Sequence, residues 1–108
     1  MSKVSGKQES MGLYKAILEL KDLDECHRFF QDLCTVSELR AMEQRYDVAV
    51  LLQQGMIYNH ILEKTGASSA TISRVNRALN YGAGGYQDVL SRILEQGEQG
   101  EQGEQEES

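Results

Sequence analysis

The sequence predicts an all-α fold, and three observations support this prediction. The chain of 108 residues contains no proline. Apolar residues recur at intervals of three and four through almost its whole length, which is the spacing of one helical face. No segment alternates apolar and polar residues over the length of a strand, so β-strands are not expected. The length indicates one domain.

Apolar stripes and capping residues place three helices in the first half of the chain. The stripes are Leu13, Ile17 and Leu20; Leu23, Cys26, Phe30 and Leu33; and Leu39, Met42, Tyr46 and Ala49. Asp22 and Thr35 each precede a glutamate by three residues, which is the spacing of a helix N-capping box. Gly55 follows the third stripe and suits a left-handed C-terminal cap. We therefore expect helices to begin after Asp22 and Thr35, and the third to end near Gly55.

The two ends of the chain are predicted to lie outside the folded domain, which spans residues 10–94. Residues 1–9 are expected to be flexible. A last amphipathic helix follows the glycine-rich segment "NYGAGGYQ" and carries Tyr86, Val89, Leu90, Ile93 and Leu94. Residues 95–108 repeat Glu-Gln-Gly and cannot bury apolar surface, so they are predicted to form a disordered acidic tail. We interpret the tail as a solvating segment, with mimicry of DNA as the alternative.

The net charge of −6 is unevenly distributed along the chain. The tail holds six glutamates and no basic residue, so the remaining residues are neutral in sum. Residues 55–82 contain Lys64, Arg74 and Arg77 against Glu63 alone, a local charge of +2. The acidic total therefore does not argue against nucleic-acid binding by the middle of the chain.

Residues 57–80 have the pattern of a helix-turn-helix. Apolar positions at helical spacing lie before and after the tetrapeptide "TGAS" at 65–68, and they are Tyr58, Ile61 and Leu62, then Ile72, Val75 and Leu79. Two short helices joined by a turn with glycine define this arrangement, and Gly66 supplies the positive φ that the turn needs. Leu62 is a departure, since these motifs usually carry a small residue four positions before the glycine. A plain helical hairpin would show a similar pattern and stays open as an alternative.

The second helix of this pair has the composition of a DNA-recognition helix. If the apolar positions face inward, small and basic residues face outward, namely Ser69, Ala70, Ser73 and Arg77. Small side chains allow close approach to the major groove, where hydroxyl and methyl groups can read base edges. Arg74 and Arg77 can bind phosphates, and Ser68 or Ser69 is expected to cap the helix. Three residues of the first helix could also reach phosphates: Tyr58, Asn59 and Lys64.

Two segments resemble the Trp repressor superfamily, most closely its YerC/YecD-type branch. They are "LCTVSELRAMEQRYDVAVLLQQG" and "EKTGASSATISRVNRALNYG", and the resemblance covers roughly residues 10–94. It implies an intertwined homodimer with six helices in each subunit. It also implies a sequence-specific DNA-binding regulator of transcription, with repression favoured over activation. The residues that match the DNA-reading helix of the family are Ser68, Ser69, Ala70, Thr71 and Ser73.

The resemblance raises the question of a tryptophan effector. In the Trp repressor, two arginines and a following glycine surround the indole. Arg45 and Arg74 match the arginines, but Val75 stands at the glycine position and is expected to intrude on the ring site. The segment between Gly55 and Gly66 is also one residue shorter. We therefore expect no tryptophan binding and no other cofactor, while a different small effector stays open.

Other classes of function find less support in the sequence. An enzyme is not expected, because two scattered histidines and two cysteines provide no nucleophile with a base and an orienting group. No spacing of metal ligands and no phosphate-binding glycine loop occurs. No apolar run is long enough to cross a bilayer and no secretory signal is apparent, so a cytoplasmic location is expected. The main alternative is a helical dimer that binds another protein without binding DNA.

Overall fold

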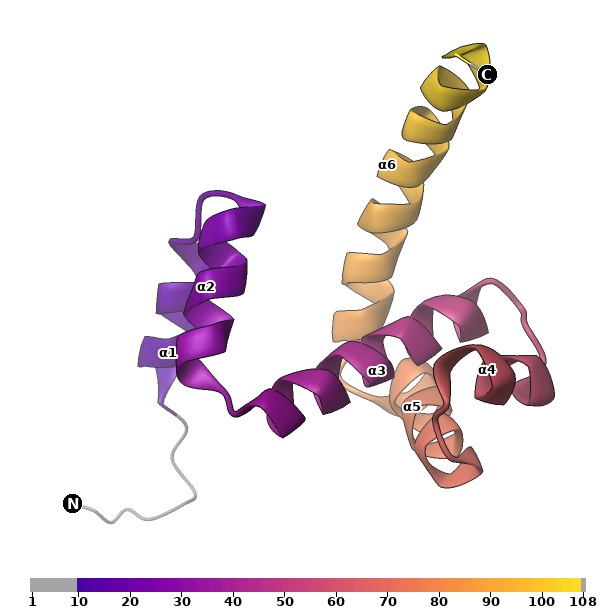
Figure 1. Ribbon diagram of the computed structural model, residues 1–108, viewed down its shortest axis with the longest axis horizontal. Helices are drawn as coiled ribbons and strands as arrows, with labels where there is room; N and C mark the ends of the chain where they lie inside the picture. The colour runs from indigo at the N-terminus through magenta and orange to yellow at the C-terminus, as the bar shows by residue number, and fades with distance from the viewer. Residues whose placement is uncertain (1–9, 108) are drawn as a thin grey trace. The chain divides into compact units, whose positions relative to one another are not determined.

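The computed structural model describes the backbone of residues 10–107 and the side chains of residues 10–97, and this part of the chain is all-α (Figure 1). Its six helices are α1 (Met11–Leu18), α2 (Leu23–Leu33), α3 (Val36–Gln53), α4 (Tyr58–Thr65), α5 (Ser69–Tyr81) and α6 (Gly85–Glu107). The described residues form no strand. The predicted fold class is confirmed, and the flexible segment expected at residues 1–9 lies outside the described residues.

Local hydrogen bonds explain where α2 begins and where α3 begins and ends. At the start of α2, the Asp22 carboxylate accepts a hydrogen bond from the Glu25 amide at 2.8 Å. At the start of α3, the Thr35 hydroxyl accepts from the Glu38 amide at 3.1 Å, and the Glu38 carboxylate accepts from the Thr35 amide at 2.8 Å, which completes a capping box. Gly55 has a φ of 86°, and the Met56 amide donates to the Leu51 carbonyl as in a Schellman cap. These predicted boundaries are confirmed.

The chain divides into two compact units, residues 1–39 and residues 40–108. In the first unit, neither α1 nor α2 contains a buried residue. Large apolar side chains face solvent there: Leu18 is 83% exposed and Leu23 is 84% exposed. The apolar stripes predicted for these two helices are therefore present, but they are not buried in a core within one chain.

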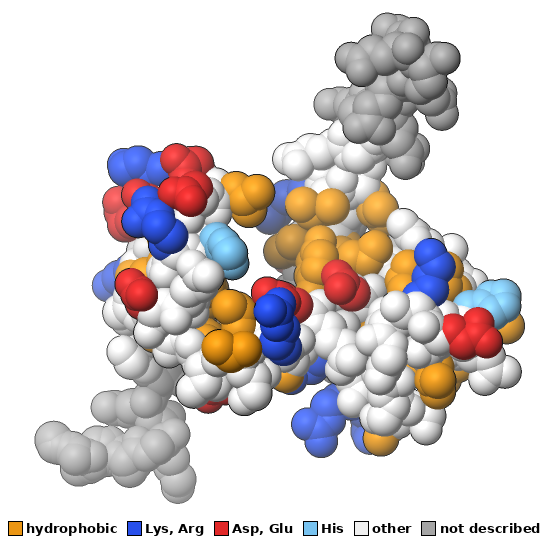
Figure 2. All heavy atoms as spheres, in the orientation of Figure 1, with side chains coloured by type: hydrophobic (Ala, Val, Ile, Leu, Met, Phe, Trp, Pro, Cys, Tyr) orange, Lys and Arg blue, Asp and Glu red, His pale blue; other side chains and the backbone are white. Residues whose placement is uncertain are grey.

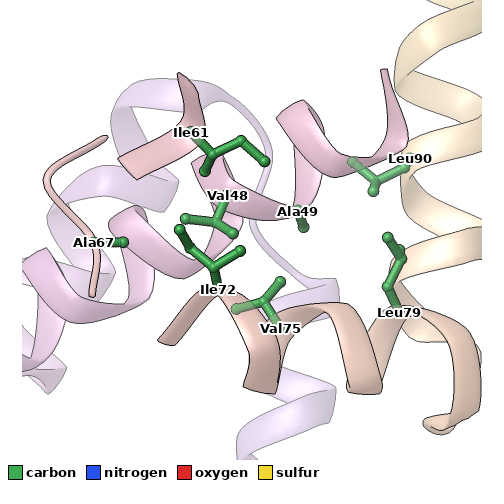
Figure 3. Close-up of a cluster of buried hydrophobic side chains, with 8 residues drawn as sticks. All are labelled: Val48, Ala49, Ile61, Ala67, Ile72, Val75, Leu79 and Leu90. Carbon is green, nitrogen blue, oxygen red and sulfur yellow. The ribbon is translucent and has the colours of Figure 1, made fainter. Parts of the chain in front are cut away.

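The second unit contains the core, which packs around α5 (Figure 3). Its buried side chains come from four helices and one turn: Val48 and Ala49 of α3, Ile61 of α4, Ala67, then Ile72, Val75 and Leu79 of α5, and Leu90 of α6. All eight are apolar, and the described residues include no buried polar or charged residue. The core therefore joins α3, α4, α5 and α6 through van der Waals packing and burial of apolar surface.

The last helix, α6, is longer than the sequence analysis predicts. It runs through to Glu107, whereas a disordered tail is expected from residue 95 onward. Glutamate and glutamine have high helix propensity and oppose the effect of the interspersed glycines, which accounts for helical backbone in a segment that carries no apolar residue. Neither α6 nor any other helix in the described part of the chain has an apolar stretch long enough to span a membrane.

Truncation of one core side chain tests this packing. Ile72 is fully buried, whereas Ile57 is 61% exposed. We expect Ile72→Ala to lower the free energy of unfolding by ~2–5 kcal/mol through lost burial and a residual cavity. Ile57→Ala is the matched control and should cost less than about 1 kcal/mol. Urea unfolding at one protein concentration measures both, and equal costs for the two variants would contradict the assigned core.

Candidate nucleic-acid interface

The turn between α4 and α5 is built by glycine and by threonine hydrogen bonds. Gly66 caps α4 with φ 72° and ψ 5°, in the left-handed region, and its amide donates to the Leu62 carbonyl at 2.9 Å. The Thr65 hydroxyl donates to the Ile61 carbonyl at 2.7 Å and accepts from the Ala67 amide at 3.1 Å. Ala67 is buried. The turn is therefore fixed on one side by backbone geometry and on the other by the core.

Ser68 is the residue that caps α5. Its side-chain oxygen accepts a hydrogen bond from the Thr71 amide at 3.1 Å, and the two hydroxyls lie 3.1 Å apart. The sequence left Ser68 and Ser69 as alternatives, and the structure selects Ser68. The hydroxyls of Ser68 and Thr71 thus support the helix start, while the side chain of Ser69 has no hydrogen bond to another described residue and is exposed.

The two faces of α5 separate as the sequence predicts. Ile72, Val75 and Leu79 are buried. The outward residues are exposed, and they are Ser69, Ala70, Ser73, Arg74 and Arg77. Thr71 is half-buried at the edge between the faces. One side of a thirteen-residue helix thus presents small side chains near its start and two arginines further along.

The first helix of the pair presents its polar residues to solvent. Tyr58, Asn59 and Lys64 are all exposed. Ile61 is the residue of α4 that enters the core, whereas Leu62 is 42% exposed. The large side chain at position 62 therefore does not obstruct the packing of α4 on α5, because it points away from the core.

A depression of about 310 Å³ lies between α3 and the start of α5. Its lining residues are Ala41, Gln44, Arg45, Ala70, Thr71 and Arg74. Among the described residues, Glu43 pairs with Arg40 at 3.3 Å, and no ion pair involves Arg45 or Arg74. The structure thus brings together the two arginines that the sequence analysis assigned to an effector pocket.

Val75 is not among the residues that line this depression, and its intrusion on the ring site stays a prediction. The valine side chain is 1% exposed and packs in the core with Ile72 and Leu79. On α5 it lies one position after Arg74 and one helical turn after Thr71, two residues that do line the depression. The absence of tryptophan binding stays a prediction, based on Val75 and on the shorter segment between Gly55 and Gly66.

The chemistry of this region favours anions. Two guanidinium groups line one depression, and each can donate several hydrogen bonds to a phosphate or carboxylate. The depression also includes Ala70 and Thr71 in the first turn of α5, where the helix dipole favours negative charge. The basic and small side chains of α5 therefore form one surface with Arg45 of α3.

Two hydrogen bonds between helices around the α4–α5 pair were missed by the sequence analysis. The side-chain amide of Gln44 donates to the Thr65 carbonyl at 3.1 Å, and that of Gln87 donates to the Leu79 carbonyl at 3.0 Å. The first bond joins α3 to α4, and the second joins α6 to α5, so each connects one of the flanking helices α3 and α6 to the helix pair α4–α5. No sequence pattern distinguishes these two glutamines from the other glutamines of the chain, because their partners lie in other helices.

Substitution of Ser68 tests its role as the N-cap of α5. We expect Ser68→Ala to lower the free energy of unfolding by ~1 kcal/mol, because an amide at the start of α5 loses its acceptor. Ser69→Ala is the matched control, and it should leave the unfolding midpoint in urea unchanged. Equal losses in the two variants would show that Ser68 is not the specific cap.

Isothermal titration with L-tryptophan tests the effector prediction. We expect no heat of binding at micromolar to millimolar ligand. Arg45→Ala is the control that assigns any heat to the depression between α3 and α5. Micromolar binding that disappears in this variant would contradict the prediction.

Comparison with known proteins places this geometry in a family. The family described as Trp repressor protein matches residues 8–94. The uncharacterized protein YerC of Bacillus subtilis (strain 168) is 50% identical over 95 residues, which span 88% of this chain and 90% of YerC. The family match covers the whole helix-turn-helix, all of α3 and the start of α6.

Two solved structures share the fold. A TrpR-like protein from Eubacterium eligens superposes with a TM-score of 0.72 and 56% identity, over 75% of this chain and 84% of that one. A proposed Trp repressor from Staphylococcus aureus superposes with a TM-score of 0.73 and 46% identity, over 76% of this chain and 82% of that one. The match of sequence and fold over most of its length shows that the chain belongs to the Trp repressor family.

Proposed function

We propose that the protein is a homodimeric, sequence-specific DNA-binding regulator of transcription that reads a two-fold-symmetric operator. The observation that carries the proposal is the outward face of α5, where small side chains are followed by two arginines with no acidic partner among the described residues. Membership of the Trp repressor family supports it. Repression is the direction of regulation that the family name favours.

Direct reading of bases falls to the start of α5. Ser69, Ala70 and Ser73 are exposed and small, so the helix can approach the floor of the major groove. The serine hydroxyls can donate to or accept from base edges, and the alanine methyl can contact a thymine methyl. Ser68 and Thr71 keep each other oriented, and their oxygens retain lone pairs for a phosphate or a base.

Contacts to the DNA backbone fall to the charged and polar residues around this face. Arg74 and Arg77 follow the small residues on α5, while Tyr58, Asn59 and Lys64 lie exposed on α4. Phosphate contacts release counterions, so affinity should fall steeply as salt rises. We assign Arg45 to the same role in the absence of an effector, because it lines one depression with Arg74.

A second copy of the chain is the proposed cover for the exposed apolar faces. The first unit has no buried residue in α1 or α2, and in the second unit Tyr46, Tyr86 and Val89 line an apolar depression of about 500 Å³. Figure 2 shows apolar side chains at the surface over the first turns of α6. A dimer would give residues 10–94 one shared core. It would also set two copies of α5 about one helical turn of DNA apart, ~34 Å.

The exposed apolar faces also favour a second candidate function. A helical module that binds another protein would use the same faces of α1, α2 and α6 without any role for α5. The two candidates differ in what the arginines do. Only the DNA-binding regulator requires Arg74 and Arg77.

Selection of bound duplexes from a random DNA pool at about 0.1 M salt tests DNA reading. We expect enrichment of a two-fold-symmetric site, and Arg77→Ala should lose it because a phosphate or base contact disappears. Arg92→Ala is the matched control, since Arg92 is exposed on α6 outside the helix pair. If no DNA sequence is enriched and the protein retains DNA only at low salt, the result would favour the protein-binding module.

Measurement of mass in solution by sedimentation tests the dimer. We expect the mass of two chains, and Val89→Asp should shift the equilibrium toward the monomer by placing a charge in the interface. Leu62→Asp is the matched control, because Leu62 and Val89 are similarly exposed, at 42% and 46%, but Leu62 lies on α4. A monomeric wild-type protein would refute the proposed assembly.

A further inference from the structure

We propose that Gln44 and Gln87 are positioning residues that hold the recognition helix at a defined angle to the flanking helices. Their side-chain amides donate to backbone carbonyls at 3.1 Å and 3.0 Å, and both bonds are partly buried. In the described part of the chain, these are the side-chain hydrogen bonds that link separate helices. All other side-chain bonds described here join residues within four positions of each other.

Both amides bind carbonyls that helix geometry leaves without a partner. The last four carbonyls of an α-helix have no amide donor within the helix. Thr65 is the last residue of α4, and Leu79 lies two positions before the end of α5. Gln44 of α3 supplies the donor for the first carbonyl, and Gln87 of α6 supplies the donor for the second. Each flanking helix therefore binds the end of one helix of the pair.

These two bonds add direction to packing that is otherwise apolar. The core that joins α3, α4, α5 and α6 contains only apolar side chains among its buried residues, and burial of apolar surface is not directional. A hydrogen bond requires a defined distance and angle. One bond lies just before the start of α5 and the other near its end, so together they restrict rotation and sliding of the helix on the core.

The consequence for DNA binding depends on the proposed function. In a dimer assembled through the flanking helices, the distance between two recognition helices depends on how rigidly each is joined to α3 and α6. A protein that contacts two half-sites needs this distance to match the operator. Non-specific binding depends on charge and not on this distance. Loss of the two bonds should therefore reduce specificity and leave non-specific affinity intact.

The test uses Gln44→Met and Gln87→Met, which keep a side chain of similar length without its donors. Gln96→Met is the matched control, since Gln96 is exposed on α6 and forms no described hydrogen bond. Hydrogen exchange of the free protein monitors the amides of residues 66–68 and of the end of α5. Binding is measured to the site selected by the wild-type protein, to versions with half-site spacing changed by one base pair, and to unrelated DNA.

We expect each glutamine variant to lose roughly five- to tenfold in affinity for the selected site, the equivalent of one hydrogen bond. Affinity for unrelated DNA should not change, discrimination between half-site spacings should weaken, and the monitored amides should exchange faster. Wild-type behaviour of both variants, or equal losses on selected and unrelated DNA, would overturn the positioning role. If the wild-type protein selects no site, the proposed function fails. Exchange then decides the inference alone: unchanged exchange would refute it, and faster exchange in both variants would support it.

Discussion

Burial of Ile72, Val75 and Leu79 decides which side of α5 faces solvent. The rest of the candidate site depends on this orientation of the helix about its own axis. The three side chains lie at helical spacing and enter a core shared by α3, α4 and α6. Because that face is covered, the opposite face with Ser69, Ser73 and Arg77 is exposed to solvent. A helix rotated by a quarter turn would bury an arginine and expose an isoleucine, which is costly on both counts.

The turn before α5 holds the start of this helix, and thereby its exposed face, in place. Gly66 reverses the chain in the left-handed region, Ala67 enters the core, and Ser68 begins the next helix with its own side-chain bond. Little of this depends on charge. The charged residues of α4 and α5 therefore stay available for a partner, since none of them forms an ion pair within the described residues. Such a division between an apolar interior and an unpaired basic exterior suits a surface that meets phosphates.

The first unit illustrates a different constraint. Asp22 caps the start of α2, and the apolar residues of both helices have regular spacing, but α1 and α2 bury no residue. A small domain buries a limited share of its surface, and oligomerisation is a common remedy. The proposed dimer would apply this remedy, because part of the core of each subunit would come from its partner.

The sequence by itself determined the features that depend on residues close together in the chain. Helix boundaries at Asp22, Thr35 and Gly55 were predictable because their hydrogen bonds close over a few residues. The inward and outward faces of α5 were predictable because helical periodicity alone sorts apolar from polar positions. Only the tertiary structure decided that Gln44 binds the end of α4 and that Gln87 binds the end of α5. These outcomes depend on how helices distant in sequence approach each other, and the choice of side-chain partners follows from that approach.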